Sequence, residues 1–363
     1  MKHFTHALSP WFDAVDGTTH FTETIPQLAS NSTALLNAML AISAKHLSLM
    51  GSLEESVCLR YVDACYNVLI PELQHRAFEC ENLAAVLILR LVMSMTDPKD
   101  VAASGNIFLG LDVFMAAWKA NPKSSLHASI FLNVLRLYIH VAWVEKTPLP
   151  EADESAHWMC DALAASGGEA RIENCKVTLQ TARCLNYAYG DRPKTWERWL
   201  EYKRISDEWR FSKPKYFNPV YAEPPMEGDP FPKRLFATDL YAFSHQTYSL
   251  ARMLLLNHQP TTPPPTHLSV VVPLTQQQIE DETLVLTRKI LGTAMSHADS
   301  PIPFISTLAV SYAGHLLTDR LAQEYAYGIL HKAQRQVAGL TPAEEFTRLR
   351  QIWAWDVPYA NVL

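Results

Sequence analysis

The run LAAVLILRLVMSM, residues Leu83–Met95, is apolar along almost its whole length and is interrupted by Arg90. A helix that is apolar on all of its faces must be surrounded by other elements. The run is too short to cross a bilayer, which takes about 20 residues. It therefore predicts a central buried helix of a protein core.

Amphipathic patterns extend on both sides of this run. Apolar residues recur at the spacing of one helix face in Leu35, Met39, Ile42 and Leu49, behind a candidate N-cap at Asn31, Ser32 or Thr33. Similar patterns predict further helices, with bounds of about 57–69, 106–118, 126–144, 154–165, 172–189, 195–210, 233–257, 276–297, 303–317, 319–338 and 341–355.

The pattern as a whole predicts an all-α protein of about a dozen helices. The chain has only 12 Gly but 23 Pro, which suits long helices that end at prolines. The single strand-like run, Ser269–Val272, is too isolated to build a sheet. We expect one large irregular domain over residues 1–363, with soft breaks in Pro-rich loops at 213–232 and 260–273. The first loop is also aromatic, so we expect it to lie pinned across the helices.

The charge distribution argues against direct nucleic-acid binding. The net charge is −6, and no basic face is evident. The best candidate is the segment 191–215, which has eight basic and five acidic residues interleaved with Trp196, Trp199, Tyr202, Trp209 and Phe211. Since the charges alternate in sign, the favoured interpretation is a helix whose aromatic residues face the core and whose charges face water.

The sequence contains no recognisable catalytic or metal-binding motif. The six cysteines form no C-x2-C pair and fit an intracellular, reduced protein. His3 and His6 with Asp13 or His20 would be the best metal ligands, but a solvated amino terminus is the favoured interpretation. No signal peptide or nucleotide-binding loop is evident. We predict no catalytic residues, no metal, no cofactor and no membrane contact.

Aromatic residues are the one feature that favours ligand binding. Large helical domains that are rich in tryptophan and tyrosine sometimes leave aromatic-lined cavities. The candidate wall residues, for which core packing is the competing interpretation, are Trp196, Trp199, Trp209, Trp353 and Trp355.

The order of the motifs resembles the fungal-specific transcription factor regulatory domain, which follows the zinc binuclear cluster in many fungal regulators. Each motif is weak and mostly apolar, so the resemblance rests on their order. The segments that carry it are His3–Asp13, Phe21, Ile25–Ala29, Leu35–Leu47, Arg60-Tyr61, Tyr66, Leu69, Trp199, Trp209, Pro214, Phe217, Pro219, Tyr248–Pro260, Phe304–Leu317 and Asp319–Leu330.

This resemblance implies an all-α regulator of transcription in the nucleus, with the cytoplasm as the alternative location. The expected partners are the transcription machinery or a DNA-binding protein, a small-molecule effector and a second copy of the chain. Many relatives control metabolic or secondary-metabolite genes. The six cysteines have the wrong spacing for the zinc cluster of such regulators, so we expect no sequence-specific DNA binding by these residues.

Two alternatives remain open. In the first, the helical scaffold serves as a small-molecule-binding protein or an enzyme of a metabolic pathway. In the second, it serves as an adaptor that dimerises through its helices.

Overall fold

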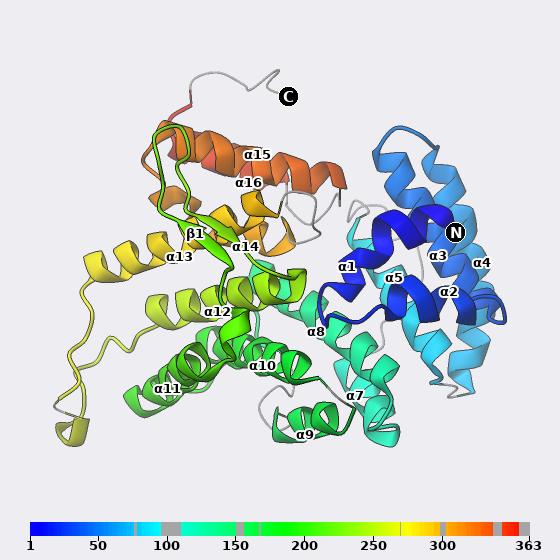
Figure 1. The fold of residues 1–363 in the computed structure, drawn as a ribbon, viewed down its shortest axis with the longest axis horizontal. Helices are drawn as coiled ribbons and strands as arrows, with labels where there is room; N and C mark the ends of the chain where they lie inside the picture. Colours follow the sequence, from blue (N-terminus) through cyan, green and yellow to red (C-terminus); the bar gives the residue numbers. More distant parts are fainter. Residues whose placement is uncertain are drawn as a thin grey trace.

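The protein folds as an irregular array of α-helices, as the periodicity predicts (Figure 1). The computed structural model describes residues 1–75, 78–95, 110–149, 156–166, 168–268, 270–297, 303–336 and 343–355. The first helices are α1 (Ser9–Asp13), α2 (Ile25–Leu28), α3 (Thr33–Leu49), α4 (Glu55–Gln74), α5 (Cys80–Ser94), α7 (Leu111–Ala120), α8 (Ser125–Glu145), α9 (Ala156–Ser166) and α10 (Glu169–Tyr189). The later helices are α11 (Trp196–Ser212), α12 (Asp239–Asn257), α13 (Gln276–Ser296), α14 (Pro303–Ala313), α15 (Arg320–Gln336) and α16 (Ala343–Ile352).

Serine and threonine caps explain where several helices begin. Each cap side chain accepts a hydrogen bond from the backbone N–H three residues later, which satisfies one of the unpaired donors of the first turn. These caps are Ser32 for α3, Ser124 for α8, Thr195 for α11, Thr238 for α12 and Thr275 for α13, the last as a capping box with Gln278. The expected starts of the helices at 106–118 and 341–355 lie outside the described residues.

The helices pack around one extensive hydrophobic cluster. The predicted central helix is α5, which packs against α3 and α8. The cluster extends from Phe4 to Ala313, and a second cluster joins the C-terminal helices around α15. In Figure 1, α3, α4 and α5 lie at one end, α8 passes through the centre, and α10 to α14 form the other end. Whether these parts form one domain remains a prediction.

Helix α8 is long and apolar enough to cross a membrane, with a mean hydropathy of 1.2, the only such helix among the described residues. Its most apolar stretch is, however, 72% buried inside the protein. A central helix of a protein core has the same composition.

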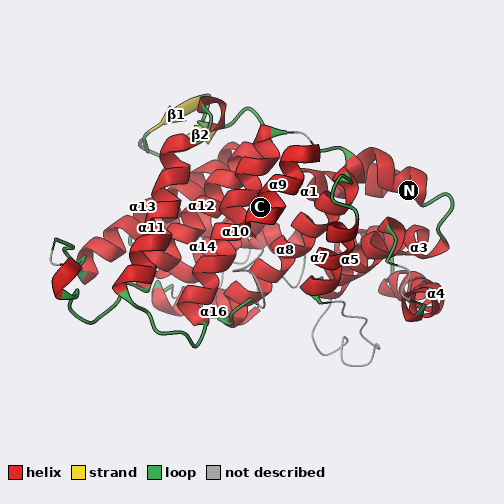
Figure 2. Cartoon of the chain, turned by 90° about the horizontal axis from the view of Figure 1, so that it is seen from below, coloured by secondary structure: helices red, strands yellow, loops and turns green. Residues whose placement is uncertain are grey.

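One two-stranded sheet is present among the described residues, which agrees with the predicted all-α class. Strands β1 (Tyr221–Glu223) and β2 (Lys233–Leu235) pair antiparallel, with Tyr221 opposite Leu235 (Figure 2). The helix expected from residue 233 begins only at Asp239, because the backbone of β2 pairs with β1 instead. The strand-like run that is expected to be too isolated to build a sheet forms none: Val270 and Val272 belong to no strand and are exposed.

The loop before and within this hairpin is only partly pinned to the helices. Phe217 and Phe231 are buried, as expected for an aromatic loop that covers helices. Tyr216, Tyr221 and Met226 are exposed.

A buried ion pair joins the N-terminal segment to the middle of the chain. The Asp16 carboxylate is fully buried and accepts a hydrogen bond from Arg171 Nη2 of α10 at 2.9 Å. It also accepts bonds from Ser129 Oγ of α8 and, at 2.8 Å, from Thr18 Oγ1. Gly17 adopts a φ of +69°, which an L side chain rarely adopts, so that the turn presents the carboxylate inward.

Neighbouring backbone carbonyls strengthen this attachment. Asn133 Nδ2 donates to Phe12 O at 3.1 Å, and Arg136 Nη1 donates to Trp11 O at 2.9 Å. Asn174 Nδ2 donates to Val15 O. The first turns are thus held by side chains that come more than a hundred residues later.

We predict that Asp16→Ala lowers the free energy of unfolding by about 3–5 kcal/mol, since it leaves the Arg171 guanidinium buried without its counter-charge. Urea unfolding followed by circular dichroism measures the effect. Glu208→Ala is the matched control, because it breaks the exposed pair with Arg204 and should change stability by about 0–1 kcal/mol. Equal effects of the two substitutions would contradict a structural role for the buried pair.

Candidate ligand-binding site beside Trp209

The five candidate tryptophans lie in three separate hydrophobic clusters and do not form one wall. Trp196 and Trp199 belong to the large cluster, with ring centroids 5.6 Å apart. Trp353 and Trp355 lie 5.2 Å apart in the C-terminal cluster. Trp209 packs in a small cluster with Phe217 and Tyr248. A ligand can therefore touch one of these groups without the others.

Each of the five indole N–H groups donates to an acceptor within the protein. The acceptors are Thr262 O for Trp196, Leu255 O for Trp199, Glu173 O for Trp209, Gly314 O for Trp353 and Gln323 Oε1 for Trp355, at distances of 2.7 to 3.0 Å. All five rings are buried. Core packing therefore accounts for their positions.

Helix α11 confirms most of the interpretation of the basic segment. Trp196, Trp199, Tyr202 and Trp209 are buried, whereas Lys203 pairs with Asp207 one turn later. Phe211 is the exception, because its ring is 78% exposed. Phe211 lies in the last turn of α11 and is not part of the cluster in which Trp209 packs with Phe217 and Tyr248.

Of the five tryptophans, Trp209 is the one that lines a described groove. The groove lies between α10 and α11, reaches α12 at Tyr248, and has a volume of about 610 Å³. Its rim is charged with both signs, including Lys176, Arg204 and Glu208. Its volume lies within the usual range for small-molecule pockets.

Buried polar groups form the floor of this groove. Gln180 Nε2 donates to Tyr202 O at 2.9 Å, while Gln180 Oε1 has no hydrogen-bond partner among the described residues. A buried acceptor without a partner is uncommon in proteins and costs free energy. A ligand or water that donates to Gln180 Oε1 would satisfy it.

A pair of cysteines lies beside the groove. Cys160 of α9 lines the groove, and its thiol is hydrogen-bonded to that of the buried Cys175 of α10. This bond lowers the pKa of Cys160 and raises that of Cys175. Burial raises the pKa of Cys58 to about 11 and those of Cys65 and Cys80 to about 12. The spacing of the cysteines along the sequence did not reveal this pair, because Cys160 and Cys175 lie on two different helices that pack together.

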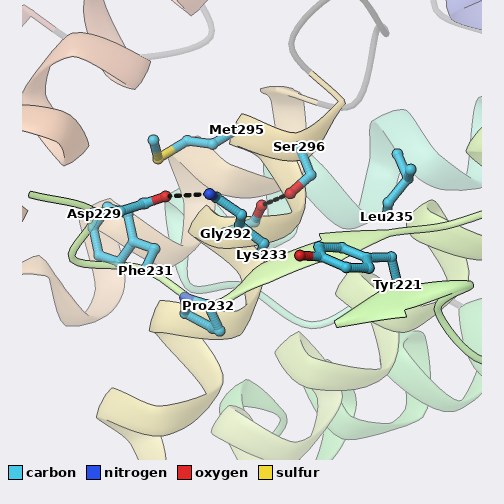
Figure 3. Close-up of a pocket in the computed structure, with 9 residues that line it drawn as sticks. All are labelled: Tyr221, Asp229, Phe231, Pro232, Lys233, Leu235, Gly292, Met295 and Ser296. Atoms are coloured by element: carbon cyan, nitrogen blue, oxygen red, sulfur yellow. Dashed lines mark hydrogen bonds and ion pairs between the residues drawn. The ribbon is translucent and has the colours of Figure 1, made fainter. Parts of the chain in front are cut away.

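A smaller pocket of about 300 Å³ lies where the hairpin meets α13 (Figure 3). Phe231, Tyr221 and Met295 line it, and Lys233 Nζ lies 3.5 Å from Asp229 Oδ2 at its edge. Gly292 allows the hairpin to lie close against α13, because a Cβ at that position would overlap the Pro232 carbonyl oxygen.

The histidines considered as metal ligands have other partners. His3 Nε2 is 2.9 Å from His46 Nδ1, His6 Nδ1 is 2.9 Å from Lys2 O, and His20 Nε2 is 2.9 Å from Ser125 Oγ. Among the described residues, no three His, Cys, Asp or Glu side chains lie together as a metal ion would require.

One family model matches the N-terminal part of the chain. Residues 1–106 match the fungal specific transcription factor domain. The match confirms the resemblance found in the motifs from His3 to Leu69. The motifs from Trp199 onward lie outside the matched residues. No curated protein and no solved structure matches the chain.

The turn at Asp16 and Gly17 lies within the matched residues, whereas Ser129 and Arg171 lie beyond them. The groove at Trp209 is also beyond the match. The groove is therefore described by its own geometry and not by the family.

We predict that Cys160 is alkylated faster than the other five cysteines by iodoacetamide at about pH 8, because the reactive species is the thiolate and its pKa is lowered. Peptide mass spectrometry measures the rates. Cys175→Ala should slow the reaction at Cys160, since it removes the hydrogen bond that stabilises the thiolate. Faster reaction at Cys58 or Cys65 would contradict the assignment.

We further predict that Gly292→Ala lowers stability by about 1–3 kcal/mol and displaces the hairpin, because the added methyl group overlaps the Pro232 carbonyl. Limited proteolysis should then cut the hairpin faster. Gly328→Ala in α15 is the control, since nothing lies within 4 Å of its Cβ position. It should be neutral or stabilising by about 0.5–1 kcal/mol. A stable, protease-resistant Gly292→Ala protein would count against the close contact.

Proposed function

We propose that the chain is the regulatory region of a fungal transcription factor and acts in the nucleus on metabolic or secondary-metabolite genes. The observation that carries the proposal is the match of residues 1–106 to the fungal specific transcription factor domain. The attachment of these residues to α8 and α10 supports a regulatory unit that extends past the match.

In this proposal the 363 residues reach their target genes through a DNA-binding partner or through the transcription machinery, and they do not bind a DNA sequence themselves. A net charge of −6 disfavours binding to the phosphate backbone. A second copy of the chain is a further proposed partner.

A second candidate function is small-molecule binding in the groove beside Trp209. It is favoured by the volume of the groove and by the unpartnered Gln180 Oε1 on its floor. The two functions are compatible, because an effector bound there would contact α10, α11 and α12 together. A thermal-shift screen against pathway metabolites tests this candidate, and no stabilisation by any of them would count against it.

We predict that residues 1–363, fused to a heterologous DNA-binding domain, change transcription of a reporter that carries its binding sites. Reporter messenger RNA measures the effect. Asp16→Ala should abolish it, because the first turns lose their attachment, while Lys123→Gln on the surface should leave it unchanged. A fusion that is folded, nuclear and without effect on the reporter would contradict the proposed function.

The partner component is tested separately with the purified protein. A gel-shift assay at physiological salt should show no sequence-selective DNA binding. Tight selective binding would overturn the proposal that a partner supplies the contact with DNA.

A further inference from the structure

Four basic side chains from three elements gather where α11 ends. Arg210 and Lys213 come from the last turn of α11 and the residue after it, Arg234 comes from β2, and Lys289 comes from α13. Burial lowers the pKa of both Lys213 and Lys289, and the charges of Arg210 and Arg234 lower it further. The four charges are therefore close enough to repel one another, and we refer to them as the basic cluster.

An aromatic surface supports the basic cluster. Arg234 Nη2 donates to His245 Nδ1 at 3.4 Å, and its guanidinium lies 5.2 Å from the centre of the Phe236 ring. Lys213 Nζ lies 5.6 Å from the centre of the Trp209 ring, and the ring centroids of Trp209 and His245 are 5.7 Å apart. Burial, with help from Arg234, Lys213 and Lys289, lowers the pKa of His245 to about 3, so His245 is neutral.

The backbone holds these side chains in place. The N–H of Arg234 donates to Ser296 Oγ of α13 at 3.0 Å, so β2 is fixed to the helix that carries Lys289. Gln246 Nε2 of α12 donates to Ile290 O at 3.1 Å, which fixes α12 beside the same turn of α13. The basic cluster is thus built by rigid elements and not by a loop.

No carboxylate neutralises the basic cluster within the described part of the chain. The nearby acids have other partners: Asp207 is engaged by Lys203 and Arg252, Asp229 by Lys233, Asp239 by His297, and Glu169 by Tyr216. Within the described residues, no carboxylate lies within ion-pair distance of Arg210, Lys213, Arg234 or Lys289. Partly desolvated like charges destabilise the folded protein unless an anion joins them.

We propose that the basic cluster binds a small oxyanion, the phosphate or carboxylate group of a small molecule, between Lys213, Arg234 and Lys289. Guanidinium and ammonium groups bind such groups through charge-assisted hydrogen bonds. Lys213, Arg234 and Lys289 are half-buried, which suits a small molecule better than the phosphates of a duplex. Lys213, Arg234 and Lys289 are not among the residues that line the groove at Gln180, and Trp209 both lines that groove and lies beside Lys213. The existence of the oxyanion site does not depend on the proposed function in transcription.

The test uses isothermal titration calorimetry on the full chain with inorganic phosphate in one arm and succinate in the other, at constant ionic strength. We expect saturable 1:1 binding of at least one probe, and the arm that binds more tightly identifies the preferred oxyanion. Arg234→Gln and Lys289→Gln should each weaken binding about tenfold or more. Lys123→Gln removes a positive charge at an exposed position outside the basic cluster and should leave the affinity for the probe unchanged.

A second measurement separates a binding role from a structural one. Without ligand, Lys289→Gln should unfold at the same or a higher urea concentration than the wild type, because it removes repulsion. With saturating ligand, the wild type should gain stability and Lys289→Gln should gain less. Loss of stability in the ligand-free variant, or equal affinity in all variants, would overturn the proposal. Competition of duplex DNA with the probe, lost in Arg234→Gln, would assign the basic cluster to nucleic acid instead.

Discussion

The buried carboxylate of Asp16 is the charge that joins the N-terminal segment to the central helices of the chain. It lies in the turn after α1, yet its hydrogen-bond donors are Arg171 of α10 and Ser129 of α8. A carboxylate removed from water is tolerated only where its partners are complete and well placed. This requirement links the position of the first turns to that of the central helices. It also means that the residues matched by the family are completed by residues outside the match.

The same principle organises the other end of the molecule. The indoles of α11 are buried because each N–H finds an acceptor on another element, as Trp209 does at Glu173 O. These contacts place α11 against α10 and leave the groove between them. Gln180 Oε1, which has no hydrogen-bond partner among the described residues, and the basic cluster proposed as an oxyanion site are the two places where the structure has interactions to offer a ligand. The two features meet at Trp209, so ligand binding on either side would act on the same ring.

The helices were predictable because their periodicity is local. The capping side chain of Ser32 and the apolar run of α5 are written within a few residues, and the structure has both where the pattern places them. The region before α12 was not predictable to the same degree. Lys233–Leu235 carries a pattern that fits a helix, but the pairing with Tyr221–Glu223 overrides it. Such pairing depends on residues across a turn, which a periodicity argument does not weigh.

The amino-acid sequence by itself determined the all-α class, the approximate helices and the family resemblance of the first hundred residues, because apolar spacing and capping residues act locally. Only the tertiary structure decided which tryptophan lines a groove, that Cys160 meets Cys175, and that Lys213, Arg234 and Lys289 gather without a carboxylate among the described residues. The physical reason is that burial and electrostatic environment belong to groups from several elements at once. The spacing of residues along one helix fixes the face on which a side chain lies, but not what it meets there.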